Sequence, residues 1–89
     1  MKNYELQFKK IFLKRLRQVP KFVYVQIVEY LEKLKRFDSA VKELDIKRLF
    51  GYKQRYRLRI GKYRILFDKY DDKLIIIVID IGSRGDIYK

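Results

Sequence analysis

An almost continuous apolar run, Leu74 to Ile81, limits the fold more than any other feature of this sequence. Asp80 is the only charged residue in it. Such a run is typical of a β-strand that is covered on both faces, and a strand of that kind lies inside a sheet. The run is much too short to cross a bilayer. We therefore expect a protein built around a β-sheet, with this segment as a central strand.

The residues before this run alternate between two kinds of side chain, which predicts two further strands. From residue 55 to residue 60, apolar residues alternate with basic ones: Tyr56, Leu58 and Ile60 against Arg55, Arg57 and Arg59. Gly61-Lys62 has the form of a two-residue hairpin turn, and a second strand is predicted from Tyr63 to Tyr70. Asp71-Asp72 supplies another tight turn before the apolar run. These three strands are expected to form an antiparallel sheet.

The amino-terminal half has the pattern of one strand and two helices. Tyr4, Leu6 and Phe8 alternate with polar residues, as in a half-buried strand. Two sets of apolar residues then recur at helical spacing, one before Pro20 and one after it: Phe8, Phe12, Leu16 and Val19, then Val23, Ile27, Leu31 and Leu34. Proline suits an early position of a helix, so it separates the two helices. The second helix is expected to end near Phe37.

Residues 38–52 are expected to be mostly irregular, with a short turn of helix over Ala40 to Leu44 as the alternative. The predicted order is therefore strand, helix, helix, strand, strand, strand. This order is typical of an α+β domain in which a helical hairpin packs on a small, largely antiparallel sheet. A chain of 89 residues suits a single domain over residues 1–89.

The chain has a formal net charge of +12 and contains no His and no Cys. These absences exclude zinc fingers, disulfide scaffolds, redox cysteines and nucleophiles that histidine activates. Any catalysis must therefore use Lys, Arg, Tyr or carboxylate side chains. Neither a membrane span nor a secretory signal is expected, and the sequence predicts a cytosolic protein.

Much of the positive charge lies between Ile46 and Arg64, where eight Lys and Arg residues occur with no acidic residue. A segment of this charge density repels itself unless a polyanion binds to it. Strand geometry places alternate side chains about 7 Å apart, close to the spacing of successive nucleic-acid phosphates. The arginines in question are Arg55, Arg57 and Arg59, with Arg64 across the hairpin. Asp68 or Asp80 is expected to pair with one of these four, and nucleic-acid binding is favoured over a merely solvated basic face.

On these residues the sequence resembles the RelE toxins of the RelE/ParE superfamily. The segments that carry the resemblance are Leu49-Phe50-Gly51, residues 56–67 (YRLRIGKYRILF), residues 77–84 (IVIDIGSR) and Tyr88. RelE toxins are small basic endoribonucleases that act on the ribosome and are encoded with a neutralising antitoxin. The resemblance therefore implies cleavage of messenger RNA in the decoding site, without a metal ion or other cofactor.

The resemblance also implies roles for individual residues. In this mechanism the 2′-hydroxyl of a nucleotide attacks its own 3′-phosphate, which leaves a 2′,3′-cyclic phosphate and a 5′-hydroxyl. Arg57 and Arg59 take the places of basic groups, often lysines, one of which accepts a proton. Arg64 takes the place of an arginine that stabilises the phosphorane. Arg84 takes the place of an arginine that helps the leaving 5′-oxygen, and Tyr88 takes the place of a tyrosine that stacks on the substrate. The other cations of the basic segment are expected to bind RNA or the ribosome: Lys47, Arg48, Lys53, Arg55 and Lys62.

Arginine at positions 57 and 59 departs from the family pattern. A guanidinium, with a pKa above about 12, is a poor proton acceptor at neutral pH. The cations are therefore expected to stabilise the charge of the transition state, while the ribosome positions the RNA. Lys53 or Lys62 is a candidate replacement for the base, because repulsion between neighbouring cations favours the neutral form of a lysine.

Two other functions are compatible with the sequence. Toxins of the ParE branch share the fold but poison DNA gyrase by binding, and a basic RNA-binding or ribosomal accessory protein would not cleave at all. Either toxin function implies an antitoxin, here a RelB-like one, and allows a toxin–antitoxin heterotetramer. The antitoxin is expected to cover the arginines, while Tyr24, Val25 and Val28 leave apolar surface for a further contact.

Overall fold

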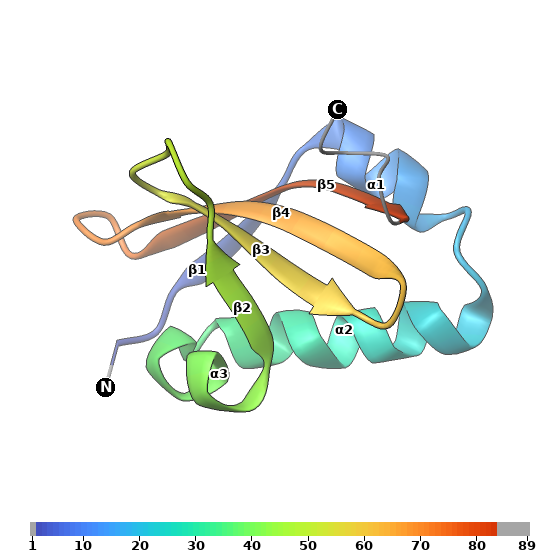
Figure 1. Ribbon diagram of the computed structural model, residues 1–89, viewed down its shortest axis with the longest axis horizontal. Helices are drawn as coiled ribbons and strands as arrows, with labels where there is room; N and C mark the ends of the chain where they lie inside the picture. Colours follow the sequence, from blue (N-terminus) through green and yellow to red (C-terminus); the bar gives the residue numbers. More distant parts are fainter. Residues whose placement is uncertain (1, 84–89) are drawn as a thin grey trace.

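The sheet contains five strands in the order β1-β5-β4-β3-β2 in the computed structural model, which describes residues 2–83 (Figure 1). The strands are β1 (Glu5–Phe8), β2 (Asp45–Arg48), β3 (Arg55–Ile60), β4 (Tyr63–Tyr70) and β5 (Ile75–Ser83). Strand β1 pairs with β5 in parallel, and the other neighbouring pairs are antiparallel. The predicted α+β class and the largely antiparallel sheet are confirmed.

Three helices complete the described part of the chain: α1 (Lys10–Leu16), α2 (Lys21–Leu34) and α3 (Phe37–Glu43). Helices α1 and α2 are the two predicted helices, and Pro20 directly precedes α2, as expected. Helix α2 runs along one side of the sheet, while α1 lies beside the end of β5 (Figure 1). Within residues 2–83, no helix combines the length and the hydrophobicity that a membrane span requires.

Residues 38–52, predicted to be mostly irregular, contain β2 and most of α3. The alternative of a short turn of helix over Ala40 to Leu44 is closer to the structure at α3, whereas β2 was not predicted. Helix α3 has only seven residues and buries Phe37 and Ala40. Strand β2 has four residues, all exposed except Ile46. Elements this short have too few residues to show a periodic pattern of apolar side chains. They form because they contact the rest of the fold, here through the pairing of β2 with β3.

Strand β5 lies between β1 and β4, as predicted for the apolar run, but its two faces differ. The residues in the core are Ile76, Val78 and Ile81, whereas Ile75, Ile77 and Ile79 are half-buried. The register between β4 and β5 shifts between Leu66 and Phe67, which pair with Asp80 and Val78. The extra residue in β5 reverses the alternation, so Ile81, and not Asp80, lies on the core side after the shift. The expectation that both faces of this strand are fully covered is therefore wrong.

One hydrophobic core joins all three helices to one face of the sheet. Its largest fully buried side chains come from α1, α2, β3, β4 and β5: Phe12, Ile27, Leu34, Leu58, Ile65, Phe67, Ile76, Val78 and Ile81. Because this core lies on one side of the sheet, every second residue of β3 and β4 is turned to the opposite side.

On the core side of β4, aromatic rings and one carboxylate surround the ammonium group of Lys69. Its Nζ lies 4.7 Å from the ring centroid of Phe37 and 5.5 and 5.6 Å from those of Tyr4 and Tyr56. It also lies 2.6 Å from Oδ1 of Asp71, which accepts a hydrogen bond from the Tyr4 hydroxyl at 2.7 Å. Burial lowers the pKa of Lys69, but Asp71 and the two tyrosines outweigh burial and raise this pKa above its usual value.

Candidate functional site

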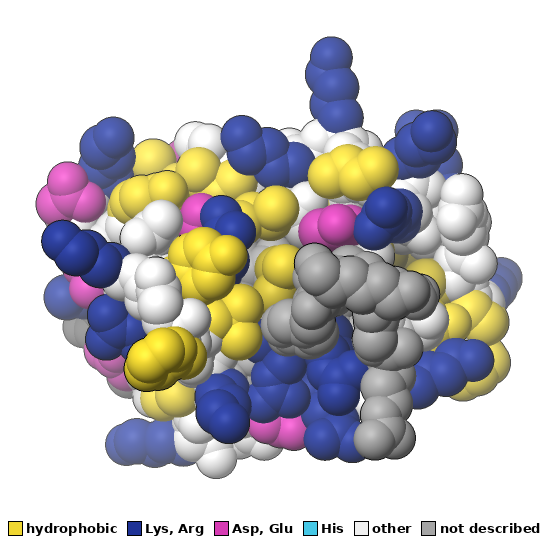
Figure 2. Space-filling view, turned by 45° about the horizontal axis from the view of Figure 1, so that its top comes forward, with side chains coloured by type: hydrophobic (Ala, Val, Ile, Leu, Met, Phe, Trp, Pro, Cys, Tyr) yellow, Lys and Arg dark blue, Asp and Glu magenta, His cyan; other side chains and the backbone are white. Residues whose placement is uncertain are grey.

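The arginines predicted to bind nucleic acid lie on the face of the sheet opposite the core. Tyr56, Leu58 and Ile60 pack in or against the core, so the alternation of β3 turns its arginines to the other side. We name this surface the arginine face and define it by Arg55, Arg57, Arg59 and Arg64. Figure 2 shows Lys and Arg side chains gathered in the lower middle of the view and others spread around its rim.

Arg59 and Arg64 form the centre of the arginine face. They are directly opposite one another in β3 and β4, which places their Cα atoms about 5 Å apart. Asp45 of β2 is opposite Arg59, and Gly82 of β5 is opposite Arg64. A row across four strands thus contains a carboxylate, two guanidiniums and a residue without a side chain. Like charges in this arrangement cost stability, which a bound anion would restore.

Arg55, at the other end of β3, is held by a carboxylate. Its Nε and Nη2 donate to the two oxygens of Asp68 at 2.8 and 3.2 Å, and its guanidinium lies 4.7 Å from the ring centroid of Tyr52. Asp68 is only 6% exposed. The hydrogen bonds to Asp68 raise the pKa of Arg55, even though burial acts in the opposite direction. The prediction that Asp68 pairs with one of the arginines is confirmed.

Arg57 has a carboxylate partner that the sequence prediction does not include. Its Nη2 donates to Oδ1 of Asp45 at 3.2 Å. The Arg57 side chain is 13% exposed and that of Asp45 is 55% exposed, so the carboxylate is the accessible member of this pair. Asp45 belongs to β2, and without that strand no pattern in the sequence places it beside the arginines. Acids therefore pair with at least two arginines of the face, and not with one.

Asp80, the other predicted partner, pairs instead with α1. Its two oxygens accept hydrogen bonds from Arg15 at 3.1 and 3.0 Å, and its Oδ1 also accepts the backbone N–H of Ile81 at 2.8 Å. Strand β1 ends at Phe8, and α1 then contacts β5. The predicted pairing of Asp80 with the arginine face is wrong, because Arg15 reaches this carboxylate from the helix.

The two predicted RNA-binding residues of β2 lie on different faces of the sheet. Lys47 is opposite Arg57 and therefore shares the side of the arginine face. Arg48 is opposite Tyr56 and is turned to the other side. Both residues are exposed. Lys47 thus extends the arginine face toward the edge of the sheet, whereas Arg48 does not.

The other predicted cations lie in connections. Lys53 belongs to the segment between β2 and β3, and Lys62 to the turn between β3 and β4, where Gly61 has a positive φ of 57°. Tyr63 packs against the core, as Tyr56 does. The predicted site residues Arg84 and Tyr88 lie outside the residues that the structure describes.

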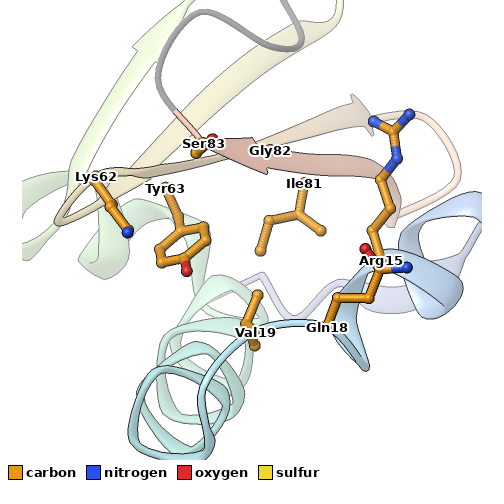
Figure 3. A pocket seen from close by; sticks show the side chains of 8 residues that line it. All are labelled: Arg15, Gln18, Val19, Lys62, Tyr63, Ile81, Gly82 and Ser83. Carbon is orange, nitrogen blue, oxygen red and sulfur yellow. The ribbon is translucent and has the colours of Figure 1, made fainter.

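A pocket of about 370 Å³ lies beside the row that contains Arg64 and Gly82 (Figure 3). Its walls come from the end of α1, the connection to α2, the hairpin turn and the end of β5. Lys62 lies beside the Tyr63 ring at this pocket, with its Nζ 5.6 Å from the ring centroid. The residues described contain no group of three or more His, Cys, Asp and Glu that could hold a metal ion.

Comparisons of sequence with known proteins give one family. The family model described as the ParE toxin of a type II toxin–antitoxin system, parDE, matches residues 6–88. The putative toxin RelE1 of Methanocaldococcus jannaschii is 35% identical over 87 residues, which are 98% of this chain and 97% of that protein. Toxin RelE3 of the same organism is 36% identical over 69 residues, 76% of this chain and 78% of that protein.

Comparisons of structure give the same fold. The RelE–RelB complex from Pyrococcus horikoshii OT3 matches with a TM-score of 0.82 and 24% identity, over 94% of this chain and 98% of that one. The RelB–RelE antitoxin–toxin complex from Methanococcus jannaschii matches with a TM-score of 0.77 and 34% identity, over 92% and 94% of the two chains. The predicted RelE-like fold is confirmed.

Proposed function

Because this chain belongs to the RelE/ParE family of type II toxins, we propose that it is a ribosome-dependent endoribonuclease that cleaves messenger RNA in the decoding site. The observation that supports this most directly is the row in which Arg59 and Arg64 are opposite one another, with Arg57 on the same face. The sequence resemblance gives Arg57 and Arg59 the places of basic groups at the reacting nucleotide and Arg64 that of the arginine that stabilises the phosphorane. Cleavage of translated messages would inhibit protein synthesis.

The arginine face suits a reaction in which negative charge develops on a phosphate. Attack of a 2′-hydroxyl on the adjacent 3′-phosphate passes through a phosphorane that carries more charge on its oxygens than the substrate does. Each fixed donor aimed at such oxygens is worth about 10²–10³ in rate. Arg59 and Arg64 are proposed to bind these oxygens, Arg84 to assist the leaving 5′-oxygen and Tyr88 to stack on the substrate.

The other cations are proposed to bind RNA or the ribosome. They are Lys47, Arg48, Lys53, Arg55 and Lys62. Of these, Arg55 already donates two of its five N–H groups to Asp68. Since several cations would contact phosphates, binding should weaken steeply as salt concentration rises.

Primer extension tests the proposed activity. Purified protein is added to ribosomes programmed with messenger RNA, and the RNA ends are mapped. We expect cuts in phase with the codon in the decoding site, and much slower cleavage of the same RNA without ribosomes, because the ribosome supplies the alignment of the reacting groups. Absence of cuts on the ribosome would contradict the proposal, and equally rapid cleavage of naked RNA would contradict its mechanism.

Inhibition of DNA gyrase is a second candidate function, which one observation favours: the matching family model is described as a ParE toxin. A supercoiling assay with purified gyrase separates the two functions. Under our proposal the protein leaves supercoiling unchanged. Inhibition of supercoiling without any RNA cleavage would select the gyrase function, and ribosome binding with neither effect would select a non-catalytic RNA-binding protein.

A RelB-like antitoxin is the proposed partner, since the two solved structures compared above are described as complexes of RelE with RelB. A groove of about 380 Å³ lies between β1, α1 and α2, and four of its apolar side chains are between 41% and 45% exposed: Phe8, Leu13, Tyr24 and Val28. Five Lys and Arg residues and no acidic residue lie between Lys9 and Arg17 along α1. An acidic amphipathic segment of the antitoxin would complement both features. The arginine face is proposed as a further surface that the antitoxin covers.

A matched pair of variants tests this groove. Val28 lines the groove, whereas Val41 lies on α3 with a similar exposure of 43%. Val28→Lys should weaken binding of the antitoxin encoded beside this protein by about 100-fold, because an unpaired ammonium would be buried in the complex. Val41→Lys should bind normally. Equal affinities for the two variants in calorimetry would contradict this docking surface.

A further inference from the structure

The proposed reaction needs a group that accepts the proton of the 2′-hydroxyl, and the inference below rests on that proposed function. No guanidinium can accept this proton at neutral pH. Lys53 lies next to the Arg55 end of β3, and strand geometry places Arg55 about 13 Å from Arg59. Lys62 lies at the pocket beside the Tyr63 ring. Neither lysine lies on the arginine face beside the central row.

Asp45 does lie there, at the end of the row that contains Arg59 and Arg64. It is opposite Arg59 in the register of β2 and β3, and its Oδ1 accepts a hydrogen bond from Arg57 at 3.2 Å. Arg57 is its only hydrogen-bond partner among the residues described, so Oδ2 has room for another donor. With 55% of its side chain exposed, Asp45 is open to a nucleotide bound across the row.

In the carboxylates of β4 and β5, both oxygens already accept hydrogen bonds from an arginine. Both oxygens of Asp68 accept from Arg55, and its side chain is only 9% exposed. Both oxygens of Asp80 accept from Arg15, and one of them accepts a backbone N–H as well. A general base needs a lone pair and a path to its substrate. Asp45 has both, and its neighbour Arg57 fixes its orientation.

The geometry therefore points to Asp45 as the general base of the proposed reaction, with Arg57 as a positioning residue. The Asp45 carboxylate takes the proton of the 2′-hydroxyl while the 2′-oxygen forms a bond to phosphorus. The bond from phosphorus to the 5′-oxygen breaks, and this oxygen keeps the electron pair and takes a proton from water. Asp45 then returns its proton to water. The products are a 2′,3′-cyclic phosphate and a 5′-hydroxyl, with no net consumption of water.

Single-turnover cleavage on programmed ribosomes, with the protein in excess, tests this assignment. Asp45→Asn should lower the rate about 10²–10⁴-fold, the usual range for the loss of a general base. Asp45→Glu keeps a carboxylate and should retain more activity than Asp45→Asn. Glu43→Gln is the matched control, because it changes the charge equally at an α3 residue that pairs with Lys33, and it should cleave at the wild-type rate. Ribosome binding should be as tight for Asp45→Asn as for the wild type, or tighter.

A pH profile distinguishes a base from a residue that only positions Arg57. The wild-type rate should be flat around neutral pH, whereas the residual rate of Asp45→Asn should rise about tenfold per pH unit as hydroxide takes over. Parallel profiles would overturn the assignment. So would an Asp45→Asn rate equal to or above the wild-type rate, which would make Asp45 a counter-ion of Arg57. A wild-type protein that makes no cuts would overturn the proposed function, and with it this inference.

Discussion

The two ends of β3 present the same residue type in different surroundings. Arg55 donates two hydrogen bonds to the buried Asp68 and lies over Tyr52. Arg59 is exposed and opposite Arg64, and it has no hydrogen bond or ion pair within the described part of the chain. Alternation alone makes these ends equivalent, so the difference comes from the neighbouring strands. Arg55, with its buried acidic partner, supports the fold, whereas Arg59 is available to a bound anion.

The largest expected effect comes from the cation-rich end. Arg59→Ala and Arg64→Ala should each lower the rate of cleavage on the ribosome about 10²–10³-fold, because a donor to the phosphorane is lost. The melting temperature of Arg59→Ala should be unchanged or higher, since two like charges no longer face each other. Single-turnover kinetics and thermal unfolding measure the two effects. Arg17→Ala, at an exposed position that follows α1, is the control and should change neither.

At the Arg55 end of β3, loss of a charged group should lower the stability of the fold. Asp68→Asn leaves a partly buried guanidinium without its partner and should lower the free energy of unfolding by about 2 kcal/mol, less than for a fully buried pair, because the Arg55 side chain is 28% exposed. For a domain of this size, the melting temperature should fall by about 8–16 °C. Asp45→Asn makes the same chemical change at a carboxylate that is 55% exposed and should cost at most about 0.5 kcal/mol. Equal losses in urea unfolding would remove the distinction between the two ends.

The positions of the arginines could be predicted from the sequence, but most of their partners could not. A two-residue turn at Gly61-Lys62 fixes the register of the hairpin, so Arg59 and Arg64 follow from local pattern alone. Asp45 lies in a four-residue edge strand with no pattern of its own. The partner of Asp80 is Arg15, which is 65 positions away in the chain. Contacts of this range depend on how the strands and helices assemble, and a periodic pattern carries no information about them.

Lys69, on the opposite face of β4 from Arg64 and Asp68, extends the comparison to a third cation. Like Arg55, it is held in place, here by three aromatic rings and Asp71, and its side chain is only 10% exposed. The hydrogen bond from Lys69, and then that from Tyr4, lowers the pKa of Asp71 below its usual value. By the same reasoning as for Arg55, this cation should contribute to stability and not to cleavage.

The Lys69–Asp71 pair predicts the smallest effect, which depends on pH. Because folding lowers the pKa of Asp71, its contribution is present above the unfolded pKa of about 4 and is lost as the pH falls through the folded value. Urea unfolding between about pH 5 and pH 2 should therefore show a shallower loss of stability for Asp71→Asn than for the wild type. The slope should differ only slightly, since the Asp71 side chain is 59% exposed and water screens the pair. Asp72→Asn, at the exposed neighbouring residue, should keep the wild-type slope. If Asp71→Asn kept it too, the aromatic rings alone would hold Lys69, and a carboxylate partner would no longer be what Lys69 shares with Arg55 and what separates both of them from Arg59.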